Sequence, residues 1–590
     1  MYKAPVEEIL FTLKHVAGMD QAMADGLLGD LDGDVVEAIL TEAGRFAGEE
    51  IAPLAEIGDR QGARLIDGEV RLPSGWPELY RDWTAGGWNG LTATEDFGGQ
   101  GLPHMLNVAT LEMWNSGSMA FALAPTLTMG AIEALSVHGS DDLKQRYLAR
   151  MISGEWTGTM NLTEPHAGSD LGALKSRAER RDDGSYRIFG QKIFITWGDH
   201  DASDNIIHLV LARLPDAPAG TRAISLFLVP KFLVGPDGSL GDRNDLFCHS
   251  LEHKLGIHAS PTCTMIYGDG RFGTEKGAVG WLIGEENKGL ACMFTMMNNA
   301  RLAVGMQGVA ICEAATQKAV EYARERTQGR APGSAASGMS PIVEHPDVIR
   351  MLLTMKVLTQ GSRSIAYACA HAIDMSKRMA GDDAKHWRER AALLTPIAKS
   401  FATDCGVDVA SLGIQVHGGM GFIEETGAAR LLRDARIAPI YEGTNGIQAI
   451  DLVTRKLPLS EGNHVRDFIA ELRNFADDER LSTDAYGETK KRLQAAVSDL
   501  ADATEWLLAT QAAGRISSAL AGASPYQRLF GLVLSGCYLA KGALVEDVAA
   551  EKRVALCRFA AENMLAETAA LKDRVINGAA SLEAARIALL

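Results

Sequence analysis

The sequence predicts an α+β protein in which one β-domain lies between helical domains. Three observations support this class. The first 155 or so residues have helical hydrophobic periodicity, residues 156–290 contain short runs rich in Ile, Val, Phe and Tyr, and the remainder returns to long helical patterns. A chain of 590 residues is too long for one hydrophobic core. We therefore expect four domains, at 1–155, 156–290, 291–460 and 461–590.

The first domain is predicted to be helical. Val35, Ile39, Ala43 and Phe46 recur at helical spacing, and Pro53 marks the end of that pattern. Further along, Ser140 is placed to cap a helix that leads into the β-domain.

The second domain is predicted to be an antiparallel sandwich or barrel. The runs "SYRIFGQKIFITWG", "NIIHLVLARL", "AISLFLVP" and "TCTMIYG" are short, apolar and separated by turn residues, with no helical pattern between them. Strands at this spacing favour antiparallel pairing over a βαβ nucleotide-binding unit.

The last two domains are predicted to be helical bundles. The stretch from "NARLAVGMQG" to Gly329 is one long amphipathic helix, and further near-continuous apolar helices follow up to about residue 455. Leu493, Val497, Leu500 and Leu507 form a stripe in an additional C-terminal bundle.

Composition excludes several function classes. A net charge of −17 argues against nucleic-acid binding, which needs clustered Lys and Arg. The eight cysteines form no CxxC pair or Cys/His cluster, so we expect no metal site and a reducing compartment. No targeting segment and no membrane span are expected, and the cytoplasm is the expected location.

Two Gly-rich or hydroxyl-rich segments could bind a ligand. In "NLTEPHAGSD", Thr163, Gly168 and Ser169 supply hydroxyls and free backbone N–H groups suited to a phosphate, although a simple capped turn explains them as well. In "QVHGGMGF", three glycines in four positions favour close approach of the backbone to a ligand, and His417 is either a base or a satisfied polar residue.

One aromatic strand segment could bind a cofactor, and one carboxylate could act as a catalytic base. In "GQKIFITWG", Phe194 and Thr196 are either core and cross-strand partners or a stacking surface and a hydroxyl for a planar cofactor. In "IYEGTNGIQ", Glu442 is either a solvated surface residue or a base that points into a pocket.

Taken together and in this order, "TEPHAGSD", "GQKIFIT", "QVHGGMGF" and "IYEGTNGIQ" resemble the signature segments of the FAD-dependent acyl-CoA dehydrogenases. The resemblance covers roughly residues 36–455. The added C-terminal region resembles a long bacterial subgroup, whose substrates include 3-methylthiopropionyl-CoA and fatty acyl-CoAs. The family implies a helical domain, a middle β-domain and a helical bundle, with the flavin between the last two.

The resemblance also implies a role for individual residues. Glu442 would take the α-proton of an acyl-CoA thioester while flavin N5 takes the β-hydride, and electrons would pass to an electron-transfer flavoprotein. The implied FAD-binding residues are Met160, Leu162, Thr163, Gly168, Ser169, Phe194 (where many members have Trp), Thr196, Arg326, Gln415, Gly418, Gly419 and Thr444. The implied substrate-binding residues are Ser169, Asn298, Arg301, Tyr441 and Gly443.

Some of the implied FAD contacts come from a neighbouring subunit, so a homodimer or homotetramer is expected. Two other readings remain open. An acyl-CoA oxidase would share the base and the flavin but deliver electrons to oxygen. A scaffold that has lost catalysis is disfavoured, because Glu442 is retained in its full "YEGT" context.

Overall fold

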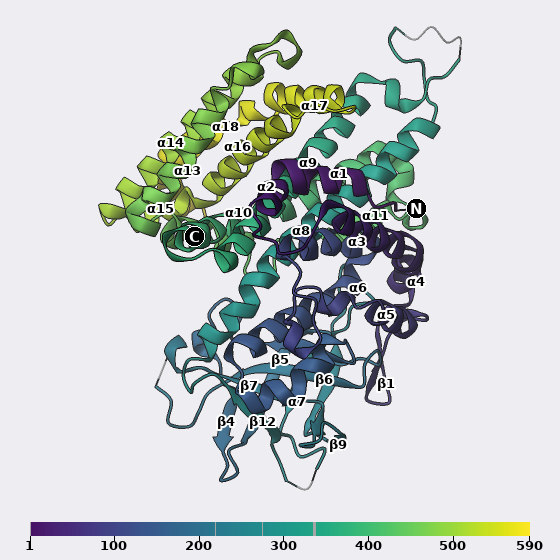
Figure 1. The fold of residues 1–590 in the computed structure, drawn as a ribbon, viewed down its shortest axis with the longest axis vertical. Coiled ribbons are helices and arrows are strands. Elements are labelled where there is room, and N and C mark those ends of the chain that lie inside the picture. The colour runs from purple at the N-terminus through teal and green to yellow at the C-terminus, as the bar shows by residue number, and fades with distance from the viewer. Residues whose placement is uncertain (1, 219, 274, 334–337, 590) are drawn as a thin grey trace. The chain divides into compact units, whose positions relative to one another are not determined.

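The computed structural model describes residues 2–218, 220–273, 275–333 and 338–589, apart from the side chains at 298 and 299, and the chain divides into two compact units (Figure 1). Unit 1 comprises Met1–Arg45, His104–Ser116 and Arg301–Leu590. Unit 2 comprises Phe46–Pro103 and Gly117–Ala300. Two long helices, α6 (His104–His138) and α8 (Gly289–Glu325), contribute to both units.

Unit 1 is a helical bundle. Its longest members besides α8 are α9 (Pro346–Arg378) and α10 (Gly381–His417), which pack along each other. Gly308 of α8 permits close packing on α10, because a Cβ there would lie 2.2 Å from the Ala402 carbonyl oxygen. The shorter helices are α1 (Val6–Phe11), α2 (Met19–Ala24), α3 (Gly33–Phe46), α11 (Ala428–Ala435) and α12 (Asn445–Asp451).

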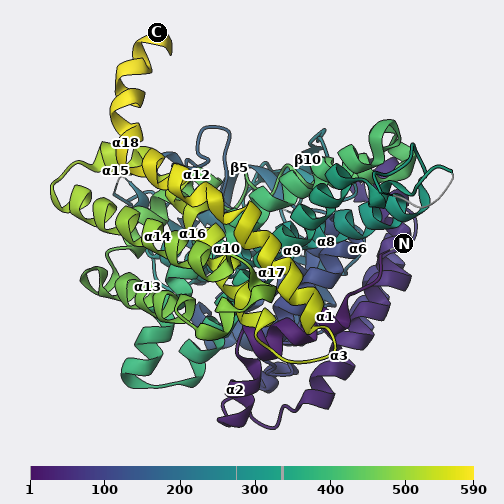
Figure 2. The ribbon, with the colours of Figure 1, turned by 90° about the horizontal axis from the view of Figure 1, so that it is seen from above.

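The additional C-terminal helices belong to the same unit. They are α13 (Asn463–Ala476), α14 (Thr489–Ala512), α15 (Ile516–Ala521), α16 (Ala523–Ala543), α17 (Ala550–Asn563) and α18 (Thr568–Ala585). Helix α16 is buried between the other extension helices and the pair α9 and α10. The last turns of α18 and the short 3-10 helix that follows it (Arg586–Leu589) leave the bundle, as Figure 2 shows, and their apolar side chains Leu582, Ile587 and Leu589 are exposed.

Unit 2 is built on an eight-stranded sheet with the order β10-β11-β5-β12-β7-β6-β3, and β4 also pairs with β5. The strands are β3 (Trp156–Asn161), β4 (Arg177–Arg180), β5 (Tyr186–Thr196), β6 (Asn205–Ala212), β7 (Ser225–Pro230), β10 (Leu246–Leu251), β11 (Thr262–Tyr267) and β12 (Ala278–Ile283). Pairing is antiparallel, as predicted, except that β3 and β6 are parallel. Strands β4 and β5 lie between β3 and β6 in the sequence, and this long connection allows β6 to run in the same direction as β3.

The remaining elements of unit 2 include α4 (Ala52–Gln61), α5 (Trp76–Ala85), α7 (Asp141–Ile152) and the short hairpin β8 (Phe232–Val234) and β9 (Leu240–Arg243). A second hairpin, β1 (Arg64–Ile66) and β2 (Glu69–Arg71), interrupts the stretch that we predicted to be wholly helical. Its turn is Asp67-Gly68, with φ of 51° and 83°, which is the conformation that an Asp-Gly hairpin turn requires.

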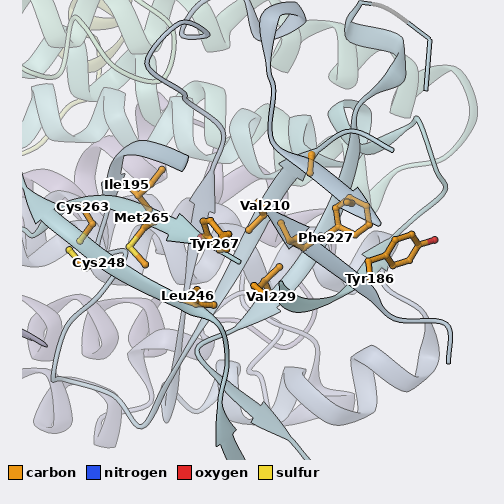
Figure 3. Packing of buried hydrophobic residues seen from close by; sticks show 14 of the residues in the cluster. Tyr186, Ile195, Val210, Phe227, Val229, Leu246, Cys248, Cys263, Met265 and Tyr267 are labelled. Carbon is orange, nitrogen blue, oxygen red and sulfur yellow. The ribbon is translucent and has the colours of Figure 1, made fainter. Parts of the chain in front are cut away.

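The core of unit 2 lies against the sheet (Figure 3). Tyr186 of β5 and Phe227 of β7 have ring centroids 4.9 Å apart, and Cys248, Cys263 and Met265 fill the other end of the cluster. All eight cysteines are buried thiols, and among the described residues no cluster of His, Cys, Asp and Glu could hold a metal ion.

Helix α6 is the one described helix that is long and apolar enough to cross a membrane by length and composition. However, 78% of its most apolar window is buried in the protein, as in the core helix of a globular protein. Ser118 interrupts its helical geometry with φ −158° and ψ 109°, so it consists of two helical segments.

Candidate active site

Glu442 lies in a tight loop of unit 1 between α11 and α12, and its backbone is left-handed, with φ of 55°. Such a conformation is unfavourable for a residue with a long side chain and persists only where its surroundings enforce it. Gly443 follows with φ of 81°, and a Cβ at this position would lie 2.8 Å from the Gln448 amide nitrogen. The positive φ therefore favours glycine beside Glu442, and a larger residue would displace the Gln448 amide.

Hydrogen bonds hold this loop from three sides. The Gln448 amide donates to the Glu442 carbonyl at 3.1 Å, and the Lys399 ammonium of α10 donates to the Gly443 carbonyl at 3.0 Å. The Tyr441 hydroxyl donates to Oε1 of Gln307 on α8. At the start of α12, the Thr444 hydroxyl caps the helix by accepting from the Ile447 N–H. The loop is thus fixed by buried groups of α8, α10 and α12.

The carboxyl of Glu442 is half-buried and lies near two cations. Burial raises the pKa of Glu442 to about 6, and the charges of Arg301 and Lys399 oppose this rise. Arg301 is itself buried, lies 3.8 Å from the Asp451 carboxylate, and has an Nε with no hydrogen-bond partner among the described residues. The predicted base Glu442 is therefore near the predicted substrate residues Tyr441, Gly443 and Arg301, whereas the Asn298 side chain lies outside the described residues.

Unit 2 brings a second set of predicted residues together. The Ile193 N–H donates to the Thr163 carbonyl at 2.9 Å, which joins the segment after β3 to the end of β5. Met160, Leu162 and Thr163 therefore lie beside Phe194 and Thr196. Ser169 and Gly168 follow on an exposed loop, and nothing lies within 4 Å of a Cβ built on Gly168.

Phe194 is presented to solvent by a bulge in β5. Register shifts by one residue opposite Ile193 and Phe194, and Phe194 has φ of 59° and an exposure of 59%. Behind it, the fully buried Lys192 donates to the Leu162 carbonyl at 3.0 Å and to Glu164 at 2.9 Å. The bulge and the buried pair hold an aromatic face outward on a rigid support.

A third set lies at one end of unit 1. Tyr322, near the end of α8, stacks on His417 at the end of α10 with ring centroids 4.5 Å apart. This contact places the ends of the two helices together, and with them Arg326 and Gln415, both exposed. His417 itself is buried and bonded to the Gly413 carbonyl at 2.7 Å, so it is a satisfied polar residue rather than a base.

The glycines after His417 carry an exposed apolar segment. Gly418 and Gly419 are exposed, with no atom within 4 Å of a Cβ built on either. Met420 and Phe422 are exposed by 50% and 83%. Glycines with open space above them and exposed apolar neighbours fit a surface that another molecule covers.

Four family models match successive parts of the chain. They are the acyl-CoA dehydrogenase N-terminal domain (residues 34–155), middle domain (159–269) and C-terminal domain (287–457), and the acetyl-CoA dehydrogenase C-terminal-like domain (468–586). The 3-methylmercaptopropionyl-CoA dehydrogenase of Ruegeria pomeroyi is 45% identical over 98% of this chain and 99% of its own length. The chain belongs to the acyl-CoA dehydrogenase family.

Solved acyl-CoA dehydrogenases share the fold over nearly the whole chain. Caenorhabditis elegans ACDH-11, solved in complex with C11-CoA, covers 96% of this chain and 92% of its own with a TM-score of 0.77 and 21% identity. The Bacillus anthracis acyl-CoA dehydrogenase complexed with FAD covers 93% and 89%, with a TM-score of 0.71 and 21% identity. The predicted fold class, including the additional C-terminal domain, is confirmed.

Sequence reasoning missed the residues that support the Glu442 loop of this acyl-CoA dehydrogenase. Asn445 and Gln448 belong to the same motif and could have been noted there. Gln307 and Lys399 lie on other helices, and no spacing links them to Glu442. The available signal for Lys399 was a lysine within an otherwise apolar helical run, "LLTPIAKSFA", which is unusual unless the charge is paired.

Proposed function

We propose that this acyl-CoA dehydrogenase oxidises 3-methylmercaptopropionyl-CoA, or a short acyl-CoA of similar size, to its trans-2-enoyl-CoA, with FAD as cofactor and an electron-transfer flavoprotein as electron acceptor. The substrate is inferred from the Ruegeria pomeroyi relative, whose similarity extends through the additional C-terminal domain. The resemblance of the motifs to FAD-dependent acyl-CoA dehydrogenases supports the cofactor and the acceptor.

The observation that carries the mechanism is the left-handed Glu442 held beside Arg301 and Lys399. A base must be ionised to accept the α-proton yet basic enough to take it. A carboxyl with a pKa of about 6 is ionised at neutral pH and is a stronger base than an ordinary glutamate. Glu442 accordingly accepts the proton from the carbon next to the thioester carbonyl.

The Glu442 backbone contributes separately. In the described chain no group accepts its N–H, whereas the Glu442 and Gly443 carbonyls are both engaged. Loss of the α-proton moves negative charge onto the thioester oxygen, and a preorganised N–H donor stabilises that charge. We assign this N–H to the thioester oxygen. Removal of one such donor costs about 10²–10³ in rate in other enzymes.

The residues predicted to hold FAD fit such a group. Phe194 offers an exposed aromatic face, and the hydroxyls of Thr163, Ser169 and Thr196 make no hydrogen bond within the described part of the chain. Unpaired hydroxyls and an outward ring suit a planar polar ring system with phosphates. When bound, FAD supplies the hydride acceptor that no side chain provides.

The base is tested with Glu442→Gln, which keeps shape and removes the proton acceptor. Anaerobic bleaching of the FAD-loaded enzyme by 3-methylmercaptopropionyl-CoA should slow by about 10²–10⁴. Glu583→Gln, on the exposed end of α18, is the matched control and should bleach like the unchanged enzyme. Unchanged bleaching in Glu442→Gln would reject Glu442 as the base.

Substrate and acceptor need their own measurements. We expect 3-methylmercaptopropionyl-CoA and butyryl-CoA to bleach the flavin faster than palmitoyl-CoA. The reduced enzyme should pass electrons to an electron-transfer flavoprotein with little oxygen uptake. Stoichiometric oxygen consumption would instead identify an acyl-CoA oxidase.

A further inference from the structure

Lys399 is a buried cation directly behind the catalytic loop. It is fully inaccessible to solvent and is surrounded along α10 by Ile397, Ala398 and Phe401, which are equally buried. Its ammonium makes two hydrogen bonds, to the Gly443 carbonyl at 3.0 Å and to Oδ1 of Asn445 at 2.8 Å. A lysine is almost never fully buried unless its ammonium group is paired or hydrogen-bonded, because desolvation of the charge is costly.

Asn445 makes the attachment rigid. Its amide nitrogen donates to Asp404 at 2.7 Å and to the Ser400 carbonyl at 3.2 Å, both on α10. Thr403 also donates to its Oδ1 at 3.3 Å. With Lys399, these hydrogen bonds attach the residues immediately after Glu442 to α10.

The charges around Lys399 favour the same role. Burial lowers its pKa to about 8, while Glu442 and Asp404 favour its ammonium form and Arg301 opposes it. The groups that face Glu442 are Arg301 from α8, Lys399 from α10 and the Tyr441 hydroxyl beside it. Arg301 also faces Asp451, and Tyr441 is neutral, so Lys399 is the cation whose position depends on the Glu442 loop itself.

We propose that Lys399 is a positioning residue for Glu442: its ammonium holds the Gly443 carbonyl and so orients the base, and its charge keeps that base ionised. The proposal rests on the proposed function, in which Glu442 takes the α-proton. Lys399 contributes in two ways, as a hydrogen-bond donor and as a positive charge, and substitutions can test the two contributions separately.

Two neutral variants separate the contributions. Lys399→Met removes both donor and charge, whereas Lys399→Gln retains an N–H donor near the Gly443 carbonyl. We expect the pH midpoint of flavin bleaching by 3-methylmercaptopropionyl-CoA, measured on FAD-loaded enzyme, to rise by about one unit in both variants. The limiting rate at high pH should fall in Lys399→Met and recover in part in Lys399→Gln.

The matched control is Lys541→Met. Lys541 on α16 is another lysine of unit 1 that donates to a backbone carbonyl, that of Val16, at 2.7 Å. Its pKa is likewise lowered by burial, and it does not face Glu442. Lys541→Met should reduce stability and leave the pH midpoint unchanged. Equal midpoints in Lys399→Gln and the unchanged enzyme would overturn the proposal even if Lys399→Met fails to fold.

A measurement without turnover completes the test. Glu442→Gln should raise the urea midpoint of unfolding at pH 8 more in the Lys399→Gln background than alone, because the ionised Glu442 then lacks its neighbouring cation. An equal effect in both backgrounds would refute the charge contribution. If Glu442→Gln bleaches normally, the proposed base is wrong; if it is inactive while Lys399→Gln keeps its midpoint, only the present inference fails.

Discussion

At the scale of single residues, Glu442 combines an unfavourable backbone conformation with a partly desolvated charge. Its φ is 55°, and burial raises its pKa to about 6 although two cations oppose the rise. Both features reduce the stability of the folded protein and are tolerated because the surrounding hydrogen bonds enforce them. A site that stores strain in this manner should become more stable when its function is removed.

Glu442→Gln should therefore be more stable than the unchanged protein, with a defined pH dependence. The folded pKa lies above the ordinary value of 4.5, so ionisation disfavours the folded state as pH rises through this interval. The variant should gain up to about 2 kcal/mol above pH 6, from the 1.4 kcal/mol that each pKa unit represents. Below about pH 4.5, where both states are protonated, the gain should vanish. Urea unfolding at pH 4 and pH 8 measures it, and a loss of stability at pH 8 would contradict the argument.

Gly443 supplies a second test at the same scale. Gly443→Ala combines a positive φ with a Cβ 2.8 Å from the Gln448 amide, so we expect a loss of about 1–3 kcal/mol and much slower flavin bleaching. Gly446→Ala is the control: the φ of Gly446 is not positive, and the added Cβ would lie 3.8 Å from Thr444 Oγ1, an ordinary contact distance. That variant should keep or slightly increase stability. Similar behaviour of the two variants would remove the case for an enforced loop.

At the scale of elements, the hydrophobic patterns predicted the helical and strand regions and the mainly antiparallel sheet, but not the parallel pairing of β3 and β6. Every residue of β6 is buried, and a short continuous apolar run fits a fully buried strand in either a parallel or a sandwich-type sheet, so the run does not reveal the direction of its neighbour. The β1–β2 hairpin, in contrast, could have been predicted locally, because Asp67-Gly68 is a dipeptide that favours a two-residue hairpin turn. Turn residues therefore carry a local signal, whereas the direction of the β3–β6 pair depends on contacts that the sequence does not show.

The same distinction applies to the site. Glu442, Tyr441 and Gly443 are adjacent in sequence and were identified together from one motif. Lys399 is 43 positions away from Glu442 and contributes through contacts between helices, which no single sequence reveals. The supporting groups of an active site are therefore the part that requires coordinates.

Helix α16 offers an element-scale prediction about close packing. Gly531 faces Phe401 of α10, and a Cβ there would lie 2.3 Å from the ring of that buried side chain. Gly531→Ala should lower the free energy of unfolding by about 1–3 kcal/mol, because the added methyl group would overlap the ring of a buried side chain. Gly578→Ala on α18, with nothing within 4 Å of its Cβ, should instead stabilise by up to about 1 kcal/mol. Thermal unfolding of both variants tests this prediction, and equal changes in their unfolding temperatures would contradict the close packing of Gly531 on Phe401.

At the scale of the whole molecule, we predict that the exposed segment after His417 lies at a contact between two copies of the chain. Met420 and Phe422 are apolar, exposed and next to residues that we predict to contact FAD across a subunit boundary. We expect a homodimer or homotetramer, with a mass of about two or four times 63.2 kDa by light scattering. Phe422→Glu should shift it toward monomer and weaken FAD retention, because a charge cannot be buried without a partner.

The control for this prediction is Val548→Glu. Val548 is fully exposed, at 107%, and lies on a loop between α16 and α17, away from the segment after His417 in sequence. This variant should keep the mass and FAD content of the unchanged protein. A monomeric parent protein that retains FAD would exclude the proposed subunit boundary.

The burial of α16 against α9 and α10 has a consequence for any attempt to shorten the chain. Ser535 of α16 lies where even a methyl group on Gly361 of α9 could not fit, since a Cβ there would be 1.8 Å from the serine oxygen. The C-terminal helices are therefore an integral part of the bundle. Their removal would expose apolar side chains of α9 and α10 to water, and the shortened chain should aggregate rather than act as a smaller enzyme.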